Sequence, residues 1–375
     1  MKNIWKVLKS KKDNKLFDAI QIEVSAACNL KCKFCPTTYL NSKDEQKFLT
    51  LSTFKKLEPY FKLTQWVYLQ GWGEPLINRD IWDMVSIVKE AGSKVGFTTN
   101  GTLLKEEVID RLILFNVDLV STSIAGASAE THEKLRVNSN FSNIIDSVKR
   151  LVKAKERSQK KFPLITLSYM LTKESIHELL RALELAHSLG VDDFYTTNLD
   201  YVFSQDANDS KIFSWENEDS LEYEQIIKKA EEYALARDFP FRSYPLKPAE
   251  EKVFCDMNPA KMVFISSSGE VAPCTYLGRF INPRYYKKQI QNISRKTFGN
   301  IHCEDFLDIW NKESYQDFRR PFIRRAQAYQ KLISSYTDYE PNLTRIKNAE
   351  KQYSETLLQN PLPEECRNCP KRFGI

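Results

Sequence analysis

Short apolar runs rich in β-branched and aromatic residues alternate with amphipathic helical patterns between residues 20 and 200. Six strands are predicted, at residues 20–25, 66–70, 95–99, 119–124, 164–171 and 194–198. Helices are predicted between them, for example at residues 79–91 and at residues 174–189, the second ending at Gly190. Because strand and helix alternate, we expect parallel βα units that form a barrel or part of one.

The pattern changes after residue 204. Residues 205–254 are charged and contain a predicted linker helix at residues 220–237. Beyond them we expect a hairpin at residues 262–271, with Ser-Ser-Ser-Gly as its turn, and helices within residues 312–360. The sequence therefore predicts a barrel domain at residues 1–204, a linker region at 205–254 and a smaller α+β domain at 255–375.

Composition and charge exclude several classes of protein. The 375 residues are 42% hydrophobic and 28% charged, which is typical of a packed globular chain rather than a disordered one. The net charge is +6, from 55 basic and 49 acidic residues, and this even mixture does not indicate nucleic-acid binding. No stretch approaches the ~20 apolar residues of a membrane helix, and no secretory signal is visible. We predict a cytoplasmic protein without a nucleic-acid or membrane partner.

Eight cysteines form two groups along the chain. The first group lies near the start and the second in the last third: Cys28, Cys32 and Cys35, then Cys255, Cys274, Cys303, Cys366 and Cys369. The cytoplasm keeps thiols reduced, so metal or redox chemistry is a better interpretation than disulfides. The two groups predict two sites.

The first group places three thiols within eight residues, in a loop soon after the first predicted strand. Three thiolates can hold three irons of a four-iron cluster, and the fourth iron then stays open for a small molecule. A zinc site with one unseen ligand, or chance clustering, is the alternative.

This spacing, with Phe34 just before the last cysteine, resembles the signature of the radical S-adenosylmethionine (SAM) superfamily. The resemblance covers most of the chain. It implies a 4Fe-4S cluster on Cys28, Cys32 and Cys35 and reductive cleavage of bound SAM to a 5′-deoxyadenosyl radical, which abstracts a hydrogen atom from a substrate carbon. It also implies oxygen sensitivity and an electron donor such as flavodoxin or ferredoxin.

Further segments at predicted strand ends resemble SAM-binding parts of this superfamily. The run from Gln70 to Pro75 is similar to its Gly-Gly-Glu-Pro segment, which holds the methionyl ammonium, with Trp72 in place of a glycine. Ala125 stands where the family often has aspartate. The resemblance implies these SAM-binding residues: Phe34, Gly71, Trp72, Gly73, Glu74, Asn100, Ser123 and Arg136. Ser123 and Arg136 are implied to contact the ribose and carboxylate of SAM; otherwise they are a strand-end hydroxyl and a solvated helix residue.

Four cysteines of the second group, namely Cys255, Cys274, Cys366 and Cys369, suffice for one closed site. Their spacing resembles the SPASM and twitch extensions of radical enzymes, in the short version that binds one auxiliary 4Fe-4S cluster. A structural zinc ion on the same thiolates is the alternative. The resulting fold prediction is a partial (β/α)6 TIM-like barrel with a smaller C-terminal α+β, SPASM/twitch-like iron-sulfur domain.

Cys303 is left over from this set. It is a buried thiol without a role, an extra cluster ligand, or a hydrogen-atom donor to a substrate radical. The last interpretation resembles radical epimerases, and it predicts epimerisation of a sugar or aminocyclitol-type small molecule with Cys303 as the catalytic donor. The alternatives are dehydrogenation of such a substrate, or peptide modification of the RiPP or sulfatase type, through the auxiliary cluster. A non-catalytic zinc- or cluster-binding protein is the alternative from another class.

Overall fold

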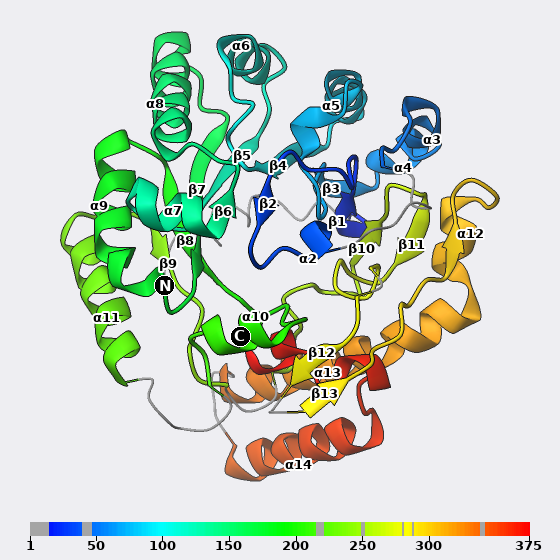
Figure 1. The fold of residues 1–375 in the computed structure, drawn as a ribbon. Helices are drawn as coiled ribbons and strands as arrows, with labels where there is room; N and C mark the ends of the chain where they lie inside the picture. The colour runs from blue at the N-terminus through cyan, green and yellow to red at the C-terminus, as the bar shows by residue number, and fades with distance from the viewer. Residues whose placement is uncertain are drawn as a thin grey trace.

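The computed structural model describes residues 15–39, 47–214, 221–248, 252–279, 281–286, 289–337 and 342–375. Its centre is a sheet in the order β14-β11-β10-β1-β3-β4-β5-β7-β8-β9 (Figure 1). Six neighbouring parallel strands form the middle: β1 (Phe17–Ile22), β3 (Thr64–Tyr68), β4 (Lys94–Thr99), β5 (Leu119–Ile124), β7 (Leu164–Leu171) and β8 (Asp193–Asn198). They are the six strands predicted from the sequence, although β1 begins and ends three residues earlier than expected.

The chain after residue 240 extends this sheet at both edges. At one edge β9 (Phe241–Arg242) pairs with β8, and at the other β10 (Met262–Ile265) runs parallel to β1. The strands β11 (Glu270–Ala272) and β14 (Gly299–Asn300) follow in antiparallel pairing. The predicted hairpin is confirmed, and Gly269 in its turn has a φ of 80°, which favours glycine. The sheet therefore continues across the domain boundary predicted at residue 255.

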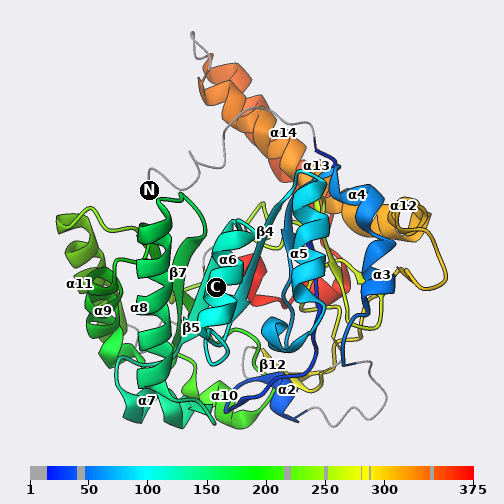
Figure 2. The same ribbon diagram turned by 90° about the horizontal axis from the view of Figure 1, so that it is seen from above.

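Amphipathic helices surround the sheet (Figures 1 and 2). They are α3 (Leu51–Lys55), α4 (Glu58–Phe61), α5 (Ile81–Glu90), α6 (Glu106–Leu114), α8 (Phe141–Ser158), α9 (Leu179–Leu189) and α11 (Leu221–Ala236). Their apolar faces bury residues such as Val85 of α5 and Val148 of α8 in the main core, with Ile20 and Ile22 of β1. Because side chains alternate along a strand, the polar Gln21 and Glu23 face away from these helices, toward the inside of the barrel.

Short elements lie where the barrel strands end. They are β2 (Lys31–Cys32), α2 (Pro36–Tyr39), η1 (Pro75–Ile77), α7 (Ala129–Leu135), β6 (Arg136–Val137), η2 (Ile176–Glu178) and α10 (Gln205–Ser210). Figure 2 shows α2, α7 and α10 at the same end of the molecule. The carboxyl ends of parallel strands in such a barrel are where active sites form.

The remaining elements come from the last quarter of the chain. They are β12 (Arg284–Tyr286), β13 (Gln289–Gln291), α12 (Phe306–Asn311), α13 (Glu313–Thr337), α14 (Leu343–Gln359), η3 (Glu364–Cys366) and η4 (Pro370–Phe373). The helix α12 packs Phe306 and Trp310 on Phe17 of β1. The helices α13 and α14 pack against each other and project from the body (Figure 2). No helix in the described ranges is long and apolar enough to cross a membrane.

Candidate functional site

The first cysteine group lies in a loop that leaves the carboxyl end of β1. Within this loop β2 pairs with β6 in antiparallel fashion, which places Cys32 opposite Arg136. The N–H of Lys33 donates to the carbonyl of Leu135 at 2.9 Å, and that of Cys35 donates to the carbonyl of Cys32 at 3.2 Å. The loop is thereby attached to the segment that follows β5, and the three thiols lie close enough to interact electrostatically.

Burial controls the chemistry of these thiols. It raises the pKa of Cys28, and it raises the pKa of Cys32 to about 11, because a thiolate is poorly solvated there. The guanidinium of Arg136 acts in the opposite direction and lowers the pKa of Cys32. Binding iron to this loop must therefore displace thiol protons, and Arg136 supplies a positive charge that favours the thiolate.

Phe34 is buried among apolar side chains. Its side chain is 4% exposed and belongs to an apolar cluster that includes Ala125, Leu135 and the terminal residue Ile375. The structure thus places Phe34 where it holds the cysteine loop against the segment after β5 and the end of the chain.

The segment Gly71–Glu74 packs directly on the residues that lead into the cysteine loop. The N–H of Glu74 donates to the carbonyl of Ala27 at 2.8 Å. A Cβ atom at Gly73 would lie 2.4 Å from that carbonyl oxygen and 2.5 Å from the carbonyl oxygen of Ser25. Only glycine permits this close approach of two main chains.

Glu74 and Asn100 connect the ends of three strands. The carboxylate of Glu74, 2% exposed, accepts from the Asn100 N–H at 2.7 Å and from the Thr99 hydroxyl at 2.7 Å, and burial raises its pKa. The side-chain amide of Asn100 donates to Asn29 at 2.8 Å and to the sulfur of Cys28 at 3.7 Å. Glu74 therefore fixes the end of β4, which in turn positions Asn100 against the cysteine loop.

The close packing at Gly73 gives a testable prediction. We expect Gly73→Ala to weaken SAM binding by roughly five- to a hundredfold, because relieving an overpacked contact costs about 1–3 kcal/mol. Equilibrium binding of SAM to the anaerobic, cluster-loaded protein measures this effect. Gly92→Ala is the control for general destabilisation, since its φ of 75° makes alanine strained there while the Cβ atom meets nothing within 4 Å. Equal affinities for the two variants would contradict the prediction.

Ser123 and Arg136 lie on either side of the segment that follows β5. Ser123, half-buried, pairs in register with Ser168 of β7. Arg136 is half-buried, and among the described residues its buried Nε atom has no hydrogen-bond partner. Ala125, at the position where aspartate was expected, is buried, and its N–H donates to Nδ1 of His132 at 3.3 Å. An unpaired guanidinium nitrogen beside the cysteine loop suits an anionic group such as a carboxylate.

Four cysteines of the second group come together. Cys255 precedes β10, Cys274 follows β11, and Cys366 and Cys369 lie at η3 and just after it; all four line one pocket. Burial raises the pKa of each of these thiols, and the negative charge of Cys369 adds to this increase at the other three. The four buried thiols therefore form one candidate set of cluster ligands.

The four thiols of the second group fit an iron-sulfur cluster. A four-iron cluster binds each thiolate to a different iron, so four thiols suffice for a closed site. Cys255, Cys274, Cys366 and Cys369 line one pocket and can supply all four ligands.

Cys303 lies apart from these four cysteines. It is exposed and is not among the residues that line their pocket. It follows β14, and the preceding carbonyls of Ile301 and His302 accept from the ammonium of Lys56, at the end of α3, at 3.2 and 3.0 Å. Cys303 is thus on the surface beside the outer helices, so the interpretation as a buried thiol is wrong.

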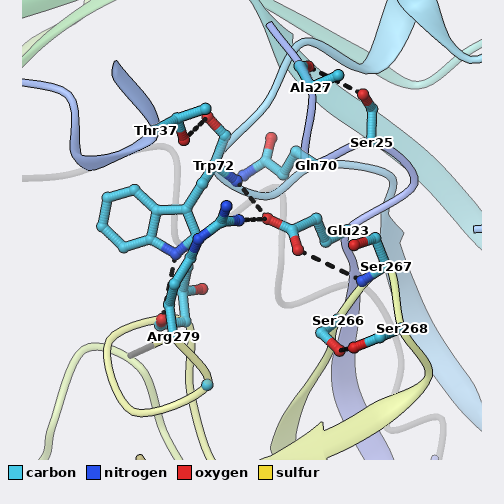
Figure 3. Close-up of polar contacts among 12 residues, drawn as sticks. Glu23, Ser25, Ala27, Thr37, Gln70, Trp72, Ser266, Ser267, Ser268 and Arg279 are labelled. Carbon is cyan, nitrogen blue, oxygen red and sulfur yellow. Dashed lines mark hydrogen bonds and ion pairs between the residues drawn. The ribbon is translucent and has the colours of Figure 1, made fainter. Parts of the chain in front are cut away.

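A buried ion pair that the sequence analysis missed lies inside the barrel (Figure 3). The carboxylate of Glu23 accepts from Arg279 at 2.8 Å, from the N–H of Trp72 at 2.9 Å and from the N–H of Ser267 at 3.3 Å. Both charged side chains are at most 5% exposed. The only sequence signal was a charged residue that continues the polar alternation of β1, which by itself is compatible with many roles.

The comparisons with known proteins agree with this geometry. Residues 22–186 match the radical SAM superfamily, and residues 255–333 match SPASM, an iron-sulfur cluster-binding domain. The chain therefore contains a radical SAM domain followed by a SPASM domain. Its radical SAM domain implies a 4Fe-4S cluster with SAM, and its SPASM domain implies auxiliary iron-sulfur clusters, as predicted. The predicted fold class is also confirmed.

Several proteins are similar to this radical SAM enzyme over most of its length. The tungsten-containing aldehyde ferredoxin oxidoreductase cofactor-modifying protein of Pyrococcus furiosus is 27% identical over 83% of this chain and 85% of its own. The AdoMet-dependent heme synthase of Methanosarcina barkeri is 25% identical over 80% of this chain and 84% of its own. Among solved structures, Streptococcus suis SuiB bound to S-adenosylmethionine superposes with a TM-score of 0.61 at 18% identity, over 80% of this chain and 67% of SuiB.

Proposed function

We propose that this radical SAM enzyme oxidises a cofactor precursor, removing two hydrogens from it overall. The observation that supports this reaction is the distribution of the second cysteine group. Four thiols share one buried pocket, whereas Cys303 is exposed beside α3. The chain therefore offers a buried cluster-binding site that can accept an electron, and the exposed Cys303 does not line it.

When bound, the first cluster and SAM supply a 5′-deoxyadenosyl radical that takes a hydrogen atom from carbon, and the auxiliary cluster supplies an acceptor for one electron. The residues of the chain have separate tasks. Cys28, Cys32 and Cys35 would hold the first cluster, and Arg136 would neutralise the carboxylate of SAM. The substrate loses one hydrogen atom, one electron and one proton, so that the product has two hydrogens fewer.

The substrate class is inferred from the names of the relatives. They include a cofactor-modifying protein, a heme synthase and a probable GTP 3′,8-cyclase, the last 26% identical over 68% of this chain. These names favour a cofactor precursor, and they give no support to the predicted epimerisation of a sugar or aminocyclitol. The electron donor, flavodoxin or ferredoxin, stays a prediction.

Product analysis in deuterated buffer tests the proposal. The anaerobic enzyme is supplied with SAM, dithionite and either the small-molecule or the peptide fraction of an extract from the source cells. We expect 5′-deoxyadenosine to form in step with a small molecule that has lost two hydrogens. A product with an unchanged skeleton and one solvent deuterium would show epimerisation instead. A product found only in the peptide fraction would overturn the substrate class but not the radical chemistry.

A further inference from the structure

Arg284 of β12 lies beside the four auxiliary cysteines. It is among the residues that line their pocket. Its partner across the β12–β13 pair is Gln291, whose side chain accepts from the side-chain amide of Asn368 at 2.7 Å. Asn368 lies in the loop between Cys366 and Cys369. The strand pair that carries Arg284 is therefore attached to the loop that carries two of the four thiols.

The guanidinium of Arg284 makes both of its hydrogen bonds through one nitrogen. Its Nη2 atom donates to the hydroxyl of Tyr201 at 2.8 Å and also to the carbonyl of Tyr276. Both partners are uncharged, so they do not neutralise the guanidinium. Its Nε atom is buried, and no described residue accepts a hydrogen bond from it. A buried donor without a partner is costly, so this Nε–H requires an acceptor that the side chains around it do not supply.

Two other charged side chains that line the pocket already have partners of opposite charge. The ammonium of Lys252 lies 3.8 Å from the carboxylate of Asp256. The carboxylate of Glu365 lies 3.1 Å from the ammonium of Lys296. Arg284 differs from both, because its guanidinium is bonded to neutral groups only. It therefore brings a positive charge to the pocket that suits an anion bound there.

Packing against the barrel fixes the orientation of this guanidinium. Its central carbon lies 4.4 Å from the ring centroid of Tyr201, the residue that also accepts its hydrogen bond. The Tyr201 ring is buried and packs edge-to-face on Trp72, with ring centroids 4.7 Å apart. The indole N–H of Trp72 in turn donates to the carbonyl of Thr275, the residue after Cys274, at 3.3 Å. Arg284 is therefore held by groups that are themselves packed beside the auxiliary cysteines.

We propose that Arg284 donates its Nε–H to a sulfur of the auxiliary cluster and offsets part of the negative charge of that cluster. The net charge of an iron-sulfur cluster and the hydrogen bonds to its sulfurs set its reduction potential. Reduction adds a negative charge, which a neighbouring cation stabilises, so Arg284 raises the potential of the auxiliary cluster. This role goes beyond the proposed function, because it concerns how readily the cluster takes up an electron and does not depend on the substrate.

The test is a redox titration of the auxiliary cluster in the holoenzyme, followed by electron paramagnetic resonance (EPR). Arg284→Met removes both the charge and the Nε–H. We expect it to disfavour reduction of the cluster roughly tenfold, which lowers the midpoint potential by about 59 mV for one electron. Arg284→Lys keeps the charge and removes the Nε–H, so we expect a smaller decrease.

Arg295→Met is the matched control. It removes the same charge from the same domain, but Arg295 does not line the cysteine pocket. Its guanidinium is already paired with Glu270, and its Nε donates to the carbonyl of Gly278 at 3.0 Å. This variant should have the midpoint potential of the wild type.

Each outcome decides the matter. A wild-type potential in Arg284→Met, or an equal decrease in Arg295→Met, would overturn the proposal, and a wild-type potential in Arg284→Lys would overturn its hydrogen bond. If Arg284→Met does not retain both clusters, citrulline incorporated at residue 284 keeps the shape and the Nε–H of arginine and removes only the charge. The potential should then fall, and an unchanged value would contradict the role of the charge. Failure of the proposed oxidation would leave these potentials unaffected, so the two proposals are tested separately.

Discussion

Replacing Cys32 by alanine is expected to reduce the formation of 5′-deoxyadenosine from SAM to background. Cys32 lies in β2, pairs with Arg136 and is one of three thiols that interact with one another in the loop after β1. With only two thiolates left, the loop can no longer bind the SAM-carrying cluster through three of its irons. Chromatographic assay of 5′-deoxyadenosine with dithionite as reductant measures the loss.

The matched control for this experiment is Cys303→Ala. Cys303 is an exposed thiol outside both cysteine sets. We expect this variant to cleave SAM at the rate of the wild type. If Cys32→Ala cleaves SAM normally, or if Cys303→Ala is as inactive as Cys32→Ala, the assignment of the first site is wrong.

Replacing Cys274 by alanine is expected to separate SAM cleavage from product formation. Cys274 lines the pocket of the four auxiliary cysteines and belongs to neither the loop after β1 nor the segment Gly71–Glu74. The variant should lose the iron of the auxiliary cluster and all substrate oxidation while still forming 5′-deoxyadenosine. Iron content, 5′-deoxyadenosine and product are measured on the same preparation.

Two results would contradict this division of roles. Full product formation by Cys274→Ala would show that the auxiliary cluster takes no part in the reaction. Loss of product from Cys303→Ala, with both clusters intact, would restore Cys303 as a hydrogen donor despite its exposed position. The first result would remove the auxiliary cluster as the electron acceptor, and the second would require the proposed oxidation to be abandoned.

The barrel was predictable because its signal is local and repeated. Each of the six strands is a short β-rich run, and each intervening helix presents one apolar face, so that periodicity alone indicates the parallel sheet. The pairing of β10 with β1 was not predictable, since it joins residues about 240 positions apart and depends on how the chain returns. For this reason the domain boundary expected at residue 255 does not interrupt the sheet.

The cysteine sets were predictable from spacing, but their surroundings were not. The grouping of Cys255 and Cys274 with Cys366 and Cys369 follows from thiol chemistry and the resemblance to SPASM extensions. The exposure of Cys303 depends on where β14 ends relative to α3. No local sequence pattern predicts that arrangement. The same is true of the indole of Trp72, whose partner Thr275 lies more than two hundred residues away.

The most direct test of the central claim is the iron content and EPR spectrum of the anaerobically reconstituted wild type beside Cys303→Ala and Cys274→Ala. The account predicts about eight irons per chain in the wild type and in Cys303→Ala, with the same two cluster signals, and about four in Cys274→Ala with only the SAM-responsive signal. Zinc in place of iron at the second site, or loss of iron from Cys303→Ala, would contradict it.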